Sequence, residues 1–142
     1  TTRGMVLKAI IEGTAFYFCE SLRALRTLGI DTSEFIATGG GAKSDVLLQT
    51  RADIFGTPFL RLKHTECGVA GAAMLAGLAT GVYKDAGQAV EQFVVRDRVF
   101  EPNPHTHEQY SDSYERYRRL YPNLKDLLGE LSRDRIQGRA GD

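Results

Sequence analysis

Three consecutive glycines, Gly39, Gly40 and Gly41, constrain this chain more than any other feature of its sequence. They follow a short apolar run at residues 35–37 that is typical of a buried strand, and they precede Ser44 and Asp45, which are typical helix N-caps. Glycine loses the most conformational entropy on ordering, so an ordered triplet needs a reason. The two candidate reasons are a tight turn and a ligand that contacts the main chain.

A strand, a glycine turn and a helix N-terminus together form a common binding site for phosphates and nucleotides, because the helix start offers unpaired N–H groups. Two familiar versions do not match. A P-loop ending at Lys43 and Ser44 needs glycine at positions 37 and 42, where this chain has alanine. A dinucleotide fingerprint starting at Gly39 needs glycine at position 44, which is serine. The pattern alone therefore leaves a nucleotide loop and a structural turn as alternatives.

The remaining pattern predicts alternating helices and strands. Apolar residues at Leu7, Ile11, Phe18, Leu22, Leu25 and Leu28 predict an amphipathic helix that ends at Gly29. The other predicted elements are a strand at 35–37, a helix from Ser44 or Asp45 to Gly56, a strand at 57–62, a helix at 66–81 capped by Thr65, a short helix at 85–93, an extended or loop segment at 94–100, and a helix at 105–120 that resumes after Pro122. This order predicts an α/β layer with parallel strands.

Two features indicate that the chain is part of a larger domain. Two short strands make a marginal sheet in water. The helix at 66–81 contains almost only small and aliphatic residues, so we expect it to be buried or tightly packed against a neighbour. Residues 132–142 contain few apolar residues and are predicted to form a disordered tail after a folded part at residues 1–131.

Composition excludes some classes of function. Lysine plus arginine equals aspartate plus glutamate, at 18 each, whereas nucleic-acid-binding domains carry a basic excess. No apolar run approaches the length of a membrane span. Cys19 and Cys67 have no metal-binding or redox spacing, and they are typical of buried thiols in a reducing cytoplasm.

Several single residues have two interpretations. Lys43 is within reach of a phosphate at the loop, but a lysine at a helix start is more often solvated. Glu12 is a candidate catalytic carboxylate in isolation, and a structural hydrogen bond is the favoured interpretation. His105 and His107 lack the companion ligands of a zinc site. Tyrosines recur at helical spacing and are expected to form a packing stripe rather than a base-stacking platform: Tyr110, Tyr114, Tyr117 and Tyr121.

The residues from the loop onward resemble the C-terminal domain of the FGGY family of carbohydrate kinases, most closely its xylulokinase-like members. The shared motifs, in order, are "GGGAKS" at 39–44, Gln49, the pair Ala52 and Asp53, "GTP" at 56–58, and the small-residue helix at 68–77. The opening "AIIEG" at 9–13 resembles the end of a second family signature. The resemblance covers residues 6–83 well and favours the nucleotide loop over the structural turn.

The resemblance implies part of an actin-like (RNase H-like) ATPase domain in an enzyme that transfers the γ-phosphoryl group of ATP, with Mg²⁺, to a sugar or polyol such as a ketopentose. It implies nucleotide binding by Gly39, Gly40, Gly41, Ala42, Lys43, Ser44 and Asp45, the last two at the edge of the adenine or ribose pocket. It also implies that the helix at 68–77 packs behind the loop against the sheet.

No catalytic residue and no metal ligand is expected here, because the family's catalytic aspartate and phosphate loops lie upstream and have no counterpart in this chain. The sugar is then held mainly by the N-terminal half, and this chain alone is expected to be inactive, because phosphoryl transfer needs several such parts. The alternative is a stand-alone nucleotide-binding or interaction module without catalysis. The sequence leaves the oligomeric state open, a homodimer included.

Overall fold

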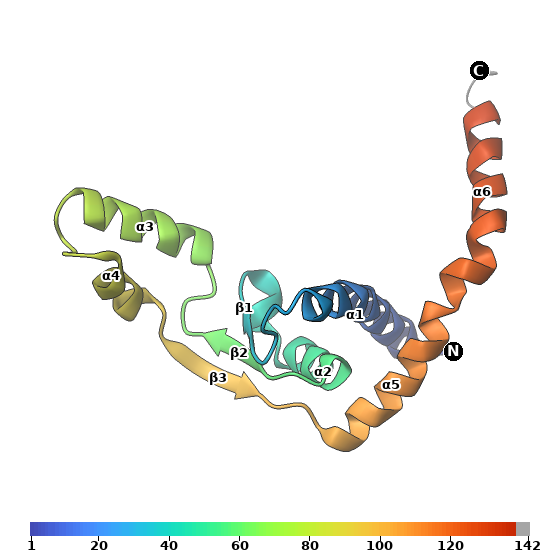
Figure 1. Cartoon of the computed structure of the whole chain (residues 1–142), viewed down its shortest axis with the longest axis horizontal. Coiled ribbons are helices and arrows are strands. Elements are labelled where there is room, and N and C mark those ends of the chain that lie inside the picture. The colour runs from blue at the N-terminus through green and yellow to red at the C-terminus, as the bar shows by residue number, and fades with distance from the viewer. Residues whose placement is uncertain (139–142) are drawn as a thin grey trace.

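The computed structural model describes residues 1–138, and the side chains of residues 1–133. The elements in chain order are α1 (Arg3–Thr27), β1 (Phe35–Ala37), the 3₁₀ helix η1 (Gly40–Lys43), α2 (Asp45–Phe55), β2 (Phe59–Leu62), α3 (Cys67–Ala79), α4 (Ala86–Phe93), β3 (Arg96–Phe100), α5 (Pro104–Arg118) and α6 (Leu120–Gly138). Figure 1 shows a central body around β1, α2 and β2, with α3 and α4 projecting at one end and α6 at the other.

The three strands form one mixed sheet in the order β1-β2-β3. β1 and β2 pair in parallel, with Phe35 opposite Phe59, which confirms the predicted parallel strands. β3 pairs antiparallel to β2, with Phe100 opposite Phe59, so the segment predicted as extended or loop is a third strand and the sheet is mixed. Only Phe100 of β3 is buried, and the strand therefore lacks the apolar pattern that would have distinguished it from a loop.

The core lies between this sheet and α2. The Ser44 hydroxyl accepts a hydrogen bond from the Leu47 amide (3.3 Å), and Gly56 ends the helix in the left-handed conformation (φ 61°), both as predicted. Leu48 and Ala52 are fully buried and pack in one cluster with Phe59 and other residues of the sheet. The predicted helix is thus confirmed at both ends, and its inner face forms the main core.

α1 also has the predicted limits, since Gly29 follows it with a φ of 73°. Its buried face differs from the predicted one, however. The buried residues are Ala15, Phe16, Cys19 and Leu22. Of the predicted stripe, Leu22 is buried and Phe18 is exposed, and both border an open groove beside β1 together with Leu25. Helical spacing identified the helix, but two adjacent faces of α1 are apolar and the sequence did not distinguish between them.

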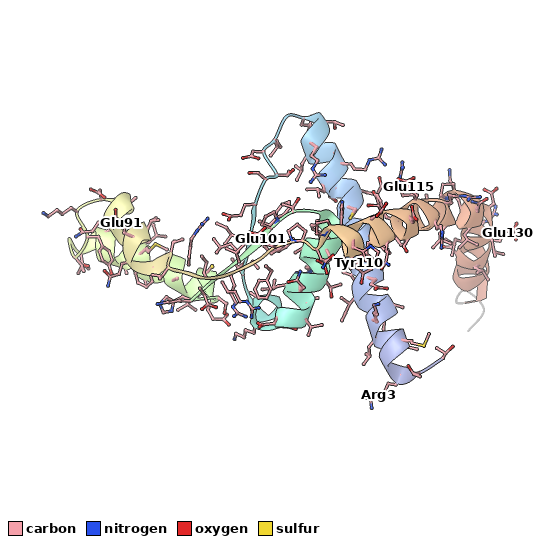
Figure 2. All side chains as sticks on the ribbon, turned by 90° about the horizontal axis from the view of Figure 1, so that it is seen from below. Arg3, Glu91, Glu101, Tyr110, Glu115 and Glu130 are labelled. Atoms are coloured by element: carbon pink, nitrogen blue, oxygen red, sulfur yellow. The ribbon has the colours of Figure 1, made fainter. Side chains whose placement is uncertain are left out.

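The predicted tyrosine stripe joins α5 to α1, and Figure 2 shows the two helices crossing beside Tyr110. Tyr110, Tyr114 and Tyr117 pack around Phe16, with ring centroids 5.5–6.2 Å apart, which confirms packing for three of the four tyrosines. Tyr121 is exposed. The Tyr110 hydroxyl donates a hydrogen bond to Glu12 (2.7 Å), and this confirms the structural interpretation of Glu12.

α3 contradicts the expectation of burial. Only Gly77 of this helix is buried, and Val69 and Leu75 are 74% and 69% exposed. The helix packs against α4, where Tyr83 lies against Gly77 and contacts Phe93, rather than behind the glycine loop. Thr65 is not its cap, because the helix begins after Glu66 without a side-chain cap. The apolar composition therefore identified a surface that needs a partner, and residues 1–133 do not supply it.

α5 and α6 extend the predicted C-terminal helix. Asn103 caps α5 and Pro122 lies in the first turn of α6, where proline is tolerated. α6 continues to Gly138, so residues 132–138 are helical where a disordered tail was predicted, and residues 139–142 lie outside the described residues. Among the described helices, none combines the length and the apolar character needed to cross a membrane.

The two cysteines are free and differ in environment, which gives a test of the α1 packing. Cys19 is buried against α2 and α5, and burial together with the nearby Glu20 carboxylate raises the pKa of its thiol to about 11. Only the thiolate is nucleophilic, so at pH 8 we expect Ellman's reagent to label Cys67 rapidly and Cys19 only after unfolding. A Cys67→Ser variant should lack the rapid phase. Two equally fast thiols in the folded chain would contradict this packing.

Candidate functional site

The glycine loop begins where β1 ends. Gly39 has a φ of 72°, a conformation that favours glycine, and its amide donates a hydrogen bond to the Thr65 carbonyl (2.7 Å). η1 follows, with the Ala42 amide bonded to the Gly39 carbonyl (3.1 Å). The turn from β1 into η1 therefore requires glycine at position 39.

The structure of the loop does not require glycine at position 40. Gly40 does not have a positive φ, and a Cβ placed on it would meet no other atom within 4 Å. A Cβ on Gly41 would lie 3.4 Å from Leu47, at ordinary contact distance. Neither backbone conformation nor packing within the described residues thus requires glycine at position 40, where the main chain faces open space.

The helix that follows the loop places two further predicted residues. Ser44 uses its hydroxyl to cap α2. Asp45 points toward the sheet, where its carboxylate forms ion pairs with Arg61 of β2 and with Arg98 of β3 (2.7 Å to Arg98). The hydrogen bonds that Arg61 donates to Asp97 and to Asp45 raise the pKa of its guanidinium. Asp45 is therefore held against the sheet by two arginines, while about half of its side chain stays exposed.

Lys43 is also paired. Its ammonium lies 2.8 Å from the Glu66 carboxylate at the start of α3, and both side chains are largely exposed. The hydrogen bond from Lys43 lowers the pKa of Glu66. This ion pair and the bond from Gly39 to Thr65 both connect the loop to the residues before α3. An exposed ion pair contributes little stability, so Lys43 is easily released toward an anionic ligand.

Gln49 and Asp53 of α2, which belong to the motifs noted in the sequence, have a structural role. Asp53 is buried, and its carboxylate accepts hydrogen bonds from Gln49 (2.9 Å) and from the Asn103 amide (2.8 Å). Gln49 also donates to the Glu101 carbonyl (2.8 Å), while His107 bonds to the Asp53 carbonyl (2.8 Å). These bonds fix α2, and with it the loop, to the segment before α5.

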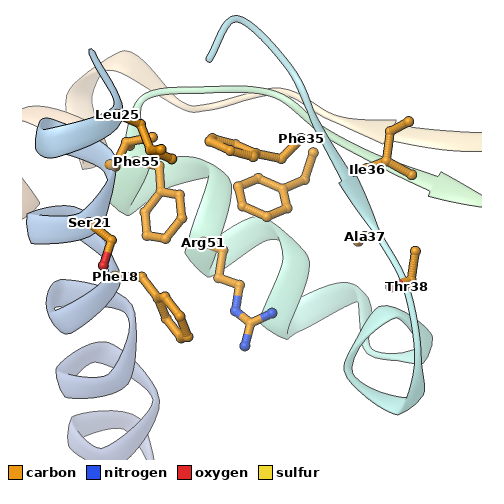
Figure 3. Close-up of a pocket in the computed structure, with 11 residues that line it drawn as sticks. Phe18, Ser21, Leu25, Phe35, Ile36, Ala37, Thr38, Arg51 and Phe55 are labelled. Carbon is orange, nitrogen blue, oxygen red and sulfur yellow. The ribbon is translucent and has the colours of Figure 1, made fainter. Parts of the chain in front are cut away.

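A groove of about 310 Å³ lies beside the loop, between α1, β1 and α2 (Figure 3). Its walls are mostly apolar, and the Arg51 side chain reaches into it. The groove borders the edge of β1 that has no strand partner among residues 1–138, and Ile36 on that edge is 54% exposed. The sequence did not predict this groove.

The seven residues that the sequence predicted to bind nucleotide are consecutive. In the structure they form the glycine turn, η1 and the start of α2. The sequence did not predict the residues that form ion pairs with Lys43 and Asp45. These are Glu66 for Lys43, and Arg61 and Arg98 for Asp45. These come from β2, β3 and the start of α3, and no local spacing relates them to the loop. Among the described residues, no group of three or more histidine, cysteine, aspartate or glutamate side chains is arranged to bind a metal ion.

Residues 1–80 match the model of the FGGY family of carbohydrate kinases, C-terminal domain. The chain is similar to a xylulose kinase of Staphylococcus epidermidis, with 38% identity over 130 residues that make up 92% of this chain and 26% of that protein. The chain thus spans about a quarter of the length of that curated relative.

Solved structures show the same likeness. One is a ligand-bound xylulose kinase from Lactobacillus acidophilus, with a TM-score of 0.73, 30% identity, and coverage of 87% of this chain and 25% of that one. Another is a Plasmodium falciparum glycerol kinase with ADP, with a TM-score of 0.67, 25% identity, and coverage of 82% and 24%.

Proposed function

Because the chain belongs to the FGGY family of carbohydrate kinases, as part of its C-terminal domain, we propose that it supplies the nucleotide-binding loop of an ATP-dependent kinase. Its fold is α/β and of the actin-like ATPase class, as predicted. In the complete protein the γ-phosphoryl group of ATP is transferred to a hydroxyl of a sugar or polyol. A ketopentose is the favoured substrate, since the relatives include several xylulose kinases.

The observation that carries this proposal is Gly40. Gly40 is open and lies just ahead of the start of α2, so its main chain leaves room for a ligand where the helix provides positive electrostatic potential. The similar glycerol kinase was solved with ADP, which supports a nucleotide as this ligand. The proposed contacts are those of residues 39–45.

The geometry refines the roles within that set. Gly40 and Gly41 offer main chain to the nucleoside, and Ala42 is buried beneath them. Lys43 is exposed and exchanges Glu66 for a phosphate oxygen. Asp45 positions the loop through Arg61 and Arg98 rather than contacting the ribose directly.

We assign ATP to this loop and no Mg²⁺ ligand to the described part of the chain. The described residues contain no grouping of carboxylates that would hold a metal. We therefore assign the Mg²⁺ to the nucleotide phosphates and to the rest of the protein, and no catalytic residue to this chain. The chain alone is then expected to bind nucleotide weakly and to be inactive, with the sugar held by the larger part of the polypeptide.

The remaining polypeptide has a further role at β1. An unpaired strand edge beside an apolar groove is a site where another strand can add to a sheet. We assign residues 1–131 to a partial C-terminal domain whose sheet is completed there by upstream residues. The two free cysteines fit a reducing, cytoplasmic location for the complete protein.

The proposal is tested by titrating the ¹⁵N-labelled chain with ADP or ATP and following amide shifts by NMR. We expect the largest shifts at residues 39–45, with affinity in the millimolar range (~4 kcal/mol of binding free energy), because only one side of the nucleotide is contacted. Shifts confined to other segments, or none at about 10 mM nucleotide, would remove the loop assignment. If the protein encoded by the complete reading frame bound nucleotide but had no kinase activity, the non-catalytic module would be favoured instead.

A further inference from the structure

The first residue of α2 places a carboxylate beside the proposed nucleotide loop. Asp45 follows the Ser44 cap directly, and 51% of its side chain is exposed. Among the described residues, the amides of Gly40, Gly41 and Val46 have no main-chain acceptor. An aspartate in the first turn of a helix ordinarily interacts with such amides, because the helix N-terminus attracts negative charge. An unrestrained Asp45 side chain would therefore compete with a phosphate for them.

Two arginines of the sheet bind this carboxylate, one at each oxygen. Oδ1 of Asp45 accepts a hydrogen bond from Arg61 of β2, and Oδ2 accepts one from Arg98 of β3 (2.7 Å). Within the described part of the chain, neither oxygen accepts a hydrogen bond from an amide of the loop or of α2. The carboxylate is therefore engaged on the sheet and not at the helix start.

The two arginines are held independently of the loop. The guanidiniums of Arg61 and Arg98 lie 5.4 Å and 4.7 Å from the centroid of the Phe100 ring, within the range of a cation–π interaction. Phe100 is buried in the core that the sheet forms with α2. Arg61 also donates a hydrogen bond to Asp97 of β3 (2.6 Å). The anchor for Asp45 is therefore part of the sheet and does not need a ligand to form.

The charges of this cluster balance. Arg61 and Arg98 are positive, and the two carboxylates that they bind, Asp45 and Asp97, are negative. The cluster therefore adds no net charge next to the glycine loop, and the partial positive charge of the α2 start is not opposed. Removing both arginines would leave two uncompensated carboxylates there.

We propose that Arg61 and Arg98 are positioning residues for nucleotide binding, which hold the Asp45 carboxylate on the sheet and compensate its charge. The amides of the loop and of the first turn of α2 then stay available to the nucleotide phosphates. This inference rests on the proposed function and adds two residues from strands outside the glycine motif. If Asp45 instead bound the ribose, the ribose hydroxyls would have to compete with the two arginines for its oxygens.

The effect should depend on the charge of the ligand. We expect the double variant Arg61→Met, Arg98→Met to bind ADP about tenfold more weakly, because the freed carboxylate repels the phosphates and competes for their amides. Binding of adenosine, which has no phosphate, should change by less than about twofold. Adding Asp45→Asn to the double variant should restore most of the ADP affinity. A distorted loop would weaken both ligands equally, and the added asparagine would not repair it.

Amide shifts of residues 39–45 measure both affinities, at about 20 mM salt, where charges interact over roughly 20 Å. The matched control is Arg118→Met on α5. Arg118 likewise forms ion pairs with two carboxylates, those of Glu20 and Glu115. Its substitution should leave both affinities unchanged, and circular dichroism checks that every variant is folded.

Asp45→Asn alone keeps the inference testable if the double variant does not fold. Asparagine retains one oxygen for the arginines and loses the charge, so ADP should bind at least as tightly as it does to the unsubstituted chain. A loss of about tenfold for both ADP and adenosine would show that Asp45 contacts the nucleoside, and would overturn the inference.

Two further outcomes separate this inference from the proposed function. Equal losses of ADP and adenosine in the double variant, or no loss of ADP, would overturn the role of Arg61 and Arg98 and leave the loop assignment intact. If ADP caused no shifts in the unsubstituted chain, the proposed function would fall, and this inference with it.

Discussion

Gly40→Val should abolish the ADP binding that is detectable at about 10 mM nucleotide and should change the free energy of unfolding by less than about 0.5 kcal/mol. The position is open and has no positive φ, so the chain itself tolerates a side chain there. A nucleoside lying against the main chain does not, because a branched side chain displaces it by an ångström or more. Amide shifts at residues 39–45 on titration with ADP, together with a urea unfolding curve, measure both quantities.

The control is Gly13→Val, which makes the same chemical change on α1, also where a Cβ meets no atom within 4 Å. It should leave the ADP-induced shifts unchanged. If Gly40→Val bound ADP as the unsubstituted chain does, the open glycine would be only a turn residue. If it unfolded the chain, the conclusion that packing does not require glycine would be wrong.

Leu48→Ala should lower the free energy of unfolding by about 3 kcal/mol, within a usual range of roughly 2–5. Leu48 is fully buried, in the cluster that α2 forms with Phe59 and Phe100. Removing three carbon atoms there loses their transfer free energy and leaves a cavity. Domains of this size are stabilised by only about 5–15 kcal/mol, so the loss is a large share of the total. Urea unfolding followed by circular dichroism measures it.

Val46→Ala is the matched control on the same helix. Val46 is 72% exposed, and its truncation should change the free energy of unfolding by no more than about 0.5 kcal/mol. Similar losses for the two variants would mean that α2 does not pack on the sheet through the face that contains Leu48. Both variants keep the Ser44 cap and Gly56, so they report on packing alone.

The elements that the sequence predicted well are those whose signals are local. Gly29 and Gly56 end their helices because glycine adopts the left-handed conformation there, and Ser44 caps α2 through its own turn. Hydrophobic spacing located α1, and tyrosine spacing predicted a packing stripe on α5. Each of these signals depends on neighbours within one or two helical turns.

What the sequence did not predict depends on residues far apart in the chain. β3 has mainly exposed side chains, and its pairing is determined by β2 rather than by its own pattern. The small-residue composition of α3 indicated a partner but did not identify one. The interactions of Asp45 and Lys43 come from β2, β3 and the residue before α3. The glycine motif therefore located the loop. Tertiary contacts determine which of its side chains form ion pairs and which remain available to a ligand.

The two links between the loop and the start of α3 have a mechanical consequence. Gly39 is bonded to Thr65 and Lys43 to Glu66, so the peptide just ahead of α3 is a brace for the turn that precedes α2. A protease cut between Thr65 and Glu66 would separate the bond to Gly39 from the bond to Lys43, while α3 and α4 would stay joined to the sheet through β3. A displacement of α3 would therefore reach the turn mainly through the hydrogen bond from Gly39 to Thr65, since the exposed ion pair is weak.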